Sequence, residues 1–136
     1  MMEIEMPKIA VEENEEKSYA KITVEPLEKG FGLTLGNALR RILLSALPGA
    51  AIQNIKFSED LGVKHEFSGI PAVKEDVTEI ILNLKCVAIK TTCLDSDYKK
   101  TVRLYKEGPA VVKAGDIPSD ADMEILNPDL YLCTID

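Results

Sequence analysis

EKGFGLTLGNALRRILLS, residues 28–45, joins a glycine-rich turn to an apolar segment and sets the arrangement of the elements around it. Alternating apolar and polar side chains before this stretch predict a strand over residues 19–27. Pro48 and Gly49 supply a stop signal, so we expect the following helix over residues 34–47. A glycine-rich turn between a strand and a helix is a setting in which proteins bind phosphate groups. The stretch therefore raises the question of a nucleotide site.

The spacing of the glycines matches neither of the common phosphate-binding motifs. Gly30, Gly32 and Gly36 follow the order G-x-G-x-x-x-G, which is one residue longer than the dinucleotide-binding order. No Gly-Lys-Ser or Gly-Lys-Thr follows, as a P-loop requires. We therefore interpret the glycines as turn residues that let the strand reverse sharply into the helix, and we expect no cofactor.

The helix expected over residues 34–47 has two different sides. At about 100° per residue, its aliphatic side chains form a broad apolar sector that must be buried. The members of this sector are Leu35, Ala38, Leu39, Ile42, Leu43 and Ala46. The other side carries Asn37, Arg40 and Arg41, with Leu44 among them. Spacing alone leaves two interpretations open, namely a protein-binding face rich in arginine or a solvated face with one exposed leucine.

A second helix is expected over residues 75–85, EDVTEIILNLK. Its apolar residues recur at i, i+3, i+4 and i+7, which is the spacing of one helical face. They are Val77, Ile80, Ile81 and Leu84. Asp76 or Glu75 lies where the amide groups of the first turn bond a negative partner. The pattern therefore predicts a short helix with one buried face.

The remaining periodic segments alternate as strands do and are separated by turn residues. We expect strands over residues 4–11, 51–58, 86–93, 99–106, 110–113, 123–126 and 130–135. Asp95 and Asp97 indicate a hairpin turn between two of them. Two helices among many short strands predict an α+β fold with antiparallel or mixed sheets. A helix-containing part over residues 1–49 and a strand-rich part over residues 50–136 are expected as two subdomains.

The composition is that of a globular chain with an acidic balance. The 136 residues carry a net charge of −7, and no window approaches the ~20 uninterrupted apolar residues that a membrane span requires. The N-terminal sequence is acidic and lacks the basic start and apolar core of a secretory signal, so we expect a cytoplasmic protein. Nucleic-acid binders carry a basic face that exchanges counterions for phosphates, so the charge disfavours direct binding to DNA.

Residues able to perform chemistry are few and scattered. His65 and Glu66 form the only candidate catalytic pair, but neighbours on an extended segment point to opposite faces. We therefore interpret His65 as a hydrogen-bonding loop residue. Cys86, Cys93 and Cys133 form no C-x-x-C pair, and we interpret them as reduced thiols in the core. The sequence predicts neither catalytic residues nor a metal site on this chain.

Three stretches together resemble a known family. They are VEPLEKGFGLTLGNALRRILLSALPGAAI over residues 24–52, the loop HEFS over residues 65–68, and VKEDVTEIILNLK over residues 73–85. With the strands that follow, they resemble the N-terminal domain of the bacterial RNA polymerase alpha subunit along essentially the whole chain. The most specific block is G-F-G-x-T-L-G-N-A-L-R-R-I-L-L-S, and plastid relatives share the pattern.

The resemblance implies a noncatalytic scaffold of DNA-directed RNA polymerase, which dimerises and assembles the beta and beta-prime subunits that hold the active site. It implies contact with DNA only through the assembled enzyme, and no contact with a membrane. The dimerisation residues that it implies are Leu35, Leu39, Ile42 and Leu43. Arg41 and Leu44 match positions that hold beta, and Arg40 lies in the same block. Lys85 matches a position in the beta-prime contact.

The resemblance also implies segments that these 136 residues do not contain. They are a later return of the chain that completes the first subdomain, a linker, and a small C-terminal domain that contacts promoter DNA. We therefore expect a partial dimerisation subdomain over residues 1–49 and a subdomain contacting beta and beta-prime over residues 50–136, as in a truncated alpha subunit or a fragment. Residues 57–68 are also slightly longer than in many members. The alternative function is a free-standing homodimeric adaptor or a nonfunctional fragment.

Overall fold

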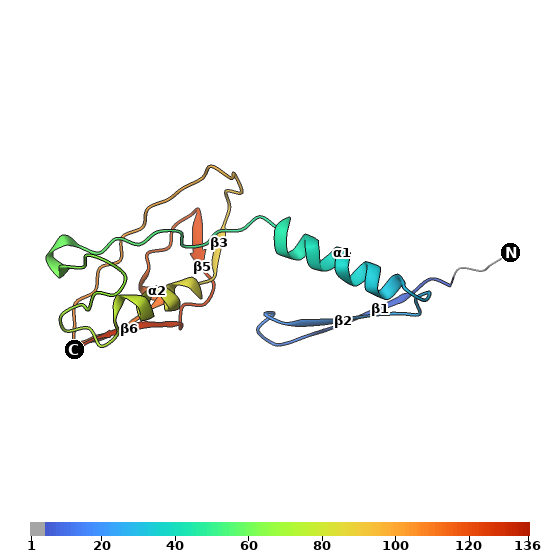
Figure 1. Ribbon diagram of the computed structural model, residues 1–136, viewed down its shortest axis with the longest axis horizontal. Coiled ribbons are helices and arrows are strands. Elements are labelled where there is room, and N and C mark those ends of the chain that lie inside the picture. Colours follow the sequence, from blue (N-terminus) through green and yellow to red (C-terminus); the bar gives the residue numbers. More distant parts are fainter. Residues whose placement is uncertain (1–4) are drawn as a thin grey trace. The chain divides into compact units, whose positions relative to one another are not determined.

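The computed structural model describes residues 5–136, which form two compact units (Figure 1). The first unit ends at Leu47 and the second begins at Pro48. Across the described residues the chain has two α-helices and six strands, and every strand pair is antiparallel. The α+β fold class predicted from the sequence is therefore confirmed. No helix within residues 5–136 combines the length and the apolar character needed to cross a membrane.

The first unit begins with a β-hairpin. Strands β1 (Lys8–Glu13) and β2 (Ala20–Glu25) pair in antiparallel register. The side chain of Asn14 closes the turn, because its Oδ1 accepts hydrogen bonds from the Ser18 and Tyr19 amides at 2.9 and 3.1 Å. The edge strand expected over residues 4–11 is found from Lys8 onward, and its expected start at Ile4 lies outside the described residues.

Helix α1 (Phe31–Ser45) starts earlier than the sequence predicted, because a single glycine makes the turn. Gly30 precedes the helix with a φ of 89°, a left-handed conformation that glycine adopts without steric cost. Gly32 and Gly36 lie inside the helix, so interpreting all three glycines as turn residues was wrong for these two. A Cβ atom at either position would meet no atom within 4 Å, so nothing in the described chain requires glycine there.

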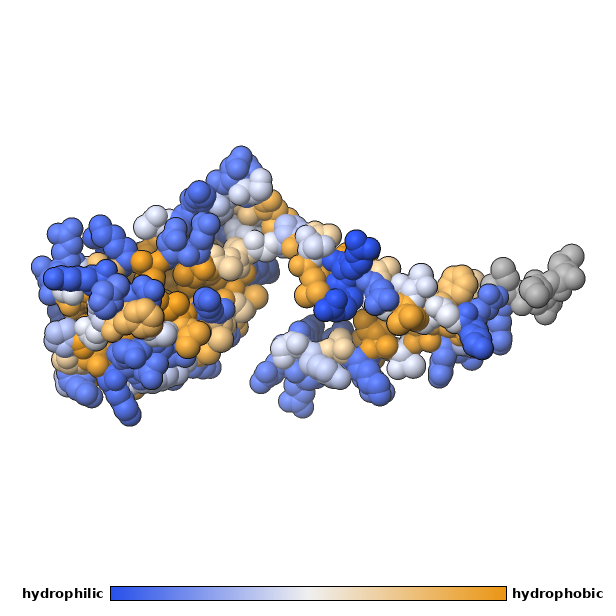
Figure 2. Space-filling model, viewed as in Figure 1, coloured by the Kyte–Doolittle hydropathy of each residue, from blue (hydrophilic) through white to orange (hydrophobic). Residues whose placement is uncertain are grey.

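The apolar sector of α1 is not covered within the described part of the first unit, residues 5–47. None of the helix residues is buried, although the sequence predicted a buried face. Figure 2 shows apolar side chains of the first unit at its visible surface, beside strongly hydrophilic ones. In the part of the first unit that the structure describes, residues 5–47, no side chain is buried. The packing partner of this sector therefore has to come from outside these residues.

The second unit has its own apolar core, built from helix α2 and four strands. Helix α2 (Val77–Lys85) is capped by Asp76, one of the two acidic residues expected at this position, and its Oδ1 accepts a hydrogen bond from the Glu79 amide at 2.9 Å. The strands are β3 (Ile89–Thr91), β4 (Ala110–Lys113), β5 (Met123–Ile125) and β6 (Tyr131–Ile135). Strand β3 pairs with β5, and β4 pairs with β6. Short 3₁₀ turns, η1 (Glu59–Leu61) and η2 (Ala114–Asp116), complete the unit.

Two groups of buried side chains make up this core. One group joins the strands and contains Val87, Val112, Ala114, Ile125 and Leu132. The other lies under α2 and contains Ile70, Val77 and Ile80. Leu84 on α2 and Cys133 on β6 pack against both groups, so they connect the helix to the sheets. The amide of Asn83 adds a hydrogen bond of 2.9 Å to the carbonyl oxygen of Leu132.

Two strands that the sequence predicted are absent from the described chain. Residues 51–58 and 99–106 have no strand assignment, and an isolated bridge from Ala50 to Ile89 is the pairing nearest to the first of them. Both segments have the expected strand-like composition, but a strand also requires a neighbour for its backbone hydrogen bonds. No such neighbour is present within residues 5–136.

The three thiols are free, and only Cys133 packs against the core groups of the second unit. Cys93 and Cys133 are partly buried, whereas Cys86 is exposed, so its prediction as a core thiol was wrong. Cys86 follows the last residue of α2 and is at the surface of the unit. Its Sγ donates to the Leu82 carbonyl oxygen at 3.6 Å. Burial raises the pKa of the Cys133 thiol, with the nearby Glu75 carboxylate as a smaller cause.

Candidate protein interface

Helix α1 positions most of the residues that the sequence singled out. Leu35, Leu39 and Ile42 follow one another at i, i+4 and i+7, and Leu43 lies one turn beyond Leu39. They therefore share one side of the helix, as predicted from the period. Their exposed fractions run from 38% at Leu35 to 62% at Leu43, which leaves a substantial aliphatic surface in contact with water.

Arg40, Arg41 and Leu44 lie on the same helix and are exposed. Leu44 is 72% exposed, more than any of the four residues of the apolar sector named above. It lies three residues after Arg41 and four after Arg40, so both guanidinium groups can lie beside it. Neither arginine forms an ion pair with any residue in the described range 5–136. The arrangement places two cationic side chains around one aliphatic side chain, which suits a protein partner with carboxylates at its edge.

Lys85 belongs to the second unit, so the structure does not group it with the α1 residues. It is the last residue of α2 and lines a shallow groove of about 60 Å³. The other walls of the groove are Ile81 and Leu84 from α2 and the segment Ile52–Ile55, which runs past the helix. A lysine in the last turn of a helix also interacts favourably with the helix dipole, so this position has a structural role as well.

The loop that contains His65 is held in one shape by hydrogen bonds. The Phe67 amide donates to His65 Nδ1 at 3.2 Å, which confirms His65 as a hydrogen-bonding loop residue. Ser68 Oγ accepts from the Lys64 amide at 3.3 Å, and Thr78 on α2 donates to the Glu66 carbonyl at 2.6 Å. Asp95 orders a turn in the same way, accepting from the Asp97 amide at 3.0 Å, but the predicted hairpin was wrong because no strand follows the turn over residues 99–106. These contacts order the two loops.

One polar network connects the segment just before α2 to the last strand and was not predicted from the sequence. The carboxylate of Glu75 accepts from the Tyr131 hydroxyl and from the Thr134 amide, the latter at 2.8 Å. Partial burial acts to raise the pKa of Glu75, but these hydrogen bonds outweigh it and hold that pKa below its ordinary value. The same hydrogen bond raises the pKa of the Tyr131 phenol. The partners are more than fifty positions apart, so spacing gave no signal of the contact.

Two further residues with a clear role in the structure were not predicted from the sequence. Phe67 is 76% exposed at the tip of the ordered HEFS loop, where a rigid aromatic side chain is a typical interface anchor. Asn127 joins two segments, since its amide donates to the Cys86 carbonyl at 2.9 Å and its Oδ1 accepts from the Ala88 amide at 2.8 Å. Phe67 could have been found from the motif, whereas Asn127 looked like a turn residue.

Within residues 5–136, no group of histidine, cysteine and acidic side chains is arranged to hold a metal ion. The candidate surfaces combine exposed apolar side chains with the exposed cations Arg40, Arg41 and Lys85, and this combination is typical of a protein interface.

Comparison with known families agrees with this description. The family model described as "RNA polymerase Rpb3/RpoA insert domain" matches residues 51–136, which is most of the second unit. The chain belongs to the RNA polymerase alpha-subunit family. This confirms the resemblance seen in the sequence.

Individual relatives of the alpha-subunit family match the entire chain. The DNA-directed RNA polymerase subunit alpha of Desulfitobacterium hafniense (strain DSM 10664 / DCB-2) is 58% identical over 137 residues. The proteins of the same name from Alkaliphilus metalliredigens and Syntrophomonas wolfei are 56% and 53% identical. Each alignment covers 100% of this chain and 42% of the relative. The chain thus spans less than half the length of the alpha subunits that it matches.

Proposed function

We propose that this chain is a noncatalytic scaffold subunit of DNA-directed RNA polymerase, which dimerises and brings the beta and beta-prime subunits together. The observation that carries the proposal is the uncovered apolar sector of α1, in a chain whose relatives are named as alpha subunits. A helix with no buried residue gains its main stabilisation from an external partner, because helix propensity alone is weak. Catalysis and contact with DNA then belong to the assembled enzyme.

The proposal assigns the two sides of α1 to different partners. Leu35, Leu39, Ile42 and Leu43 form the dimer contact. Arg41 and Leu44, with Arg40 beside them, hold beta, and Lys85 contacts beta-prime. The exposure of all these side chains and the absence of ion pairs at the arginines within residues 5–136 support this assignment. In this arrangement one helix of 15 residues serves two interfaces.

Co-purification tests the assignment directly. Tagged chain is coexpressed with the beta subunit of Desulfitobacterium hafniense, and the Arg41→Ala variant is expected to capture at least tenfold less beta, since exposed arginines are frequent interface hot spots. The dimer constant of the same variant should stay unchanged. Lys21→Ala is the matched control, because Lys21 is an exposed cation on β2 with no assigned contact.

The outcome also separates the scaffold from its alternative. A free-standing homodimeric adaptor would dimerise through α1 but would not capture beta, with or without the arginine. If the unaltered chain captures beta and Arg41→Ala captures it equally well, the scaffold role stands and the assignment of Arg41 is wrong.

A further inference from the structure

Residues 99–107 form an extended segment whose backbone has no hydrogen-bonding partner among the described residues 5–136. No backbone amide or carbonyl group of this segment is hydrogen-bonded to any other part of the described chain, residues 5–136. Figure 1 shows the segment as an extended trace at the periphery of the second unit, outside the paired strands. Its sequence, KKTVRLYKE, is rich in the β-branched and aromatic residues that favour strands. It therefore has the composition and shape of a strand without a neighbour.

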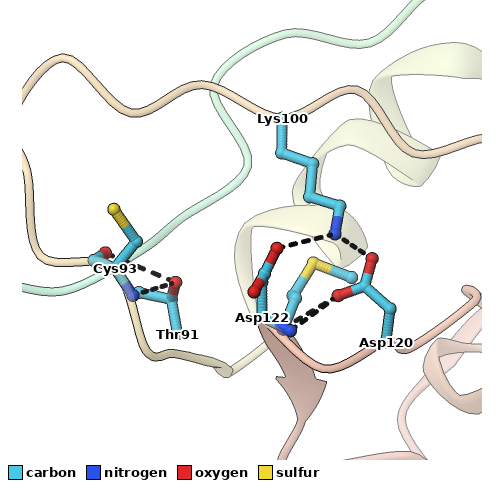
Figure 3. Close-up of polar contacts among 6 residues, drawn as sticks. Thr91, Cys93, Lys100, Asp120 and Asp122 are labelled. Carbon is cyan, nitrogen blue, oxygen red and sulfur yellow. Dashed lines mark hydrogen bonds and ion pairs between the residues drawn. The ribbon is translucent and has the colours of Figure 1, made fainter.

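Ion pairs at both ends hold this segment against the second unit. Lys100 lies between Asp120 and Asp122 (Figure 3), and the distance to the Asp122 carboxylate is 4.0 Å. At the other end, Lys106 Nζ lies 2.9 Å from Asp116 Oδ1. The Asp120 carboxylate is itself fixed, because its other oxygen accepts from the Asp122 amide at 2.9 Å. The segment is thus ordered before any partner arrives, which reduces the entropy lost on binding.

The two faces of the segment differ in charge. In an extended chain successive side chains alternate, so Lys100 and Lys106 share one face with Val102, which is half-buried. The opposite face carries Lys99, Thr101, Arg103, Tyr105 and Glu107, all of them exposed. Glu107 accepts a hydrogen bond from the Tyr105 hydroxyl, whereas Lys99 and Arg103 have no ionic partner among the described residues. This face is therefore cationic in a chain whose net charge is −7.

We propose that residues 99–107 accept an extended acidic segment of another protein by β-strand addition. The free backbone groups supply the main-chain ladder, and directly opposed side chains lie on the same face of the pair. Carboxylates four residues apart in the partner, about 13 Å along an extended chain, then lie opposite Lys99 and Arg103. The site goes beyond the scaffold function proposed above, because it uses neither α1 nor Lys85.

A second copy of the same segment fits this edge less well than an acidic peptide. In an antiparallel self-pairing centred on Arg103, the two arginines would lie directly opposite each other and Lys100 would face Lys106, while only Lys99 and Glu107 would form a pair of opposite charge. Like charges directly opposite each other destabilise a strand pair. Charge complementarity therefore favours a partner of opposite sign.

The test uses a fluorescent nonapeptide, TVEVTVEVT, which alternates valine with threonine and glutamate. In end-to-end antiparallel pairing with residues 99–107, its two glutamates lie opposite Thr101 and Tyr105, and sliding the peptide by two residues brings them opposite Lys99 and Arg103. Anisotropy with the 136-residue chain should show saturable binding that weakens as salt is raised. A peptide with lysines in place of both glutamates should bind at least tenfold more weakly. A peptide N-methylated at alternate amides should also lose binding, because it keeps the charges but cannot form the ladder.

Variants of the chain place the site on this segment. Arg103→Glu should weaken binding of the glutamate peptide about tenfold and improve binding of the lysine peptide, since cross-strand charge pairs favour opposite signs. Thr101→Pro removes one backbone donor at an exposed position and should weaken both peptides. Lys21→Ala on β2 should change neither. Equal binding of the N-methylated peptide, or a lysine peptide that binds unaltered chain as well as the glutamate peptide does, would overturn the proposal. Self-association of the unaltered chain that Thr101→Pro abolishes, with no peptide binding, would also overturn it in favour of a second copy.

Discussion

Truncating one leucine on α1 tests the dimer contact more sharply than any other change. Leu39 lies at the centre of the apolar sector and is 44% exposed in the described chain. Fully burying a leucine side chain stabilises by about 2 kcal/mol, so covering the exposed remainder contributes about 1 kcal/mol per copy. A two-fold dimer contains the substitution twice, so Leu39→Ala should cost about 2 kcal/mol of association free energy. The dimer Kd should therefore rise about 30-fold.

Sedimentation equilibrium over a micromolar concentration range measures that Kd, and Leu44→Ala is the matched control. Leu44 undergoes the same chemical change on the same helix and is the more exposed of the two residues, at 72%. It lies outside the dimer contact in our assignment, so its Kd should stay within about twofold of the unaltered chain, well below the cost of an interface hot spot. Alanine is the best helix former, so neither change should reduce the helix signal in circular dichroism.

The assignment of the dimer contact to the apolar sector of α1 is refuted if Leu44→Ala weakens the dimer as much as Leu39→Ala does. It is also refuted if the chain is a monomer at high micromolar concentration, because the uncovered apolar sector would then need no second copy.

Three further predictions follow from individual contacts in the two units. Gly36→Ala should stabilise α1 by about 1 kcal/mol, seen as a higher helix content, and weaker dimerisation by the same variant would indicate that a partner approaches closely at this position. Glu75→Gln should lower the free energy of unfolding by about 1 kcal/mol in urea titrations, because the hydrogen bonds to β6 lose their charge. The pKa of Glu75 is lowered in the folded state, so the ionised carboxylate stabilises the fold above the unfolded pKa near 4.5. This stabilisation is lost as the pH falls through the folded pKa. The unaltered chain should therefore lose stability in that acid range more steeply than Glu75→Gln. Gly108→Ala should destabilise the second unit by about 2 kcal/mol in thermal unfolding, because its Cβ would lie 2.3 Å from Cγ2 of Ile135.

Local signals in the sequence predicted the elements that depend on local interactions. Strand β2 followed from alternation, and α2 followed from the period of its apolar face and from Asp76, whose capping bond spans three residues. The two sides of α1 also followed from periodicity, because the spacing between two residues of a helix determines whether they share a face. The start of α1 was missed by three residues, since only the backbone conformation of Gly30 shows where the turn ends.

Long-range contacts could not be predicted from one sequence. Residues 51–58 and 99–106 have the composition of strands, yet strand formation depends on a neighbour that composition does not reveal. The bond between Glu75 and Tyr131 joins positions 56 residues apart, so no spacing rule identifies it. For the candidate interface, periodicity separated the faces of α1, and the roles of Arg41 and Lys85 came from the family resemblance alone.

The absence of any buried residue in α1 has a consequence for the life of the chain in a cell. A folded core protects a polypeptide from proteases, and the described residues of the first unit have none of their own. Copies that find a partner gain protection, whereas solitary copies present an aliphatic helix to chaperones and proteases. Degradation would then adjust the amount of this chain to the number of partners available, without any dedicated regulator.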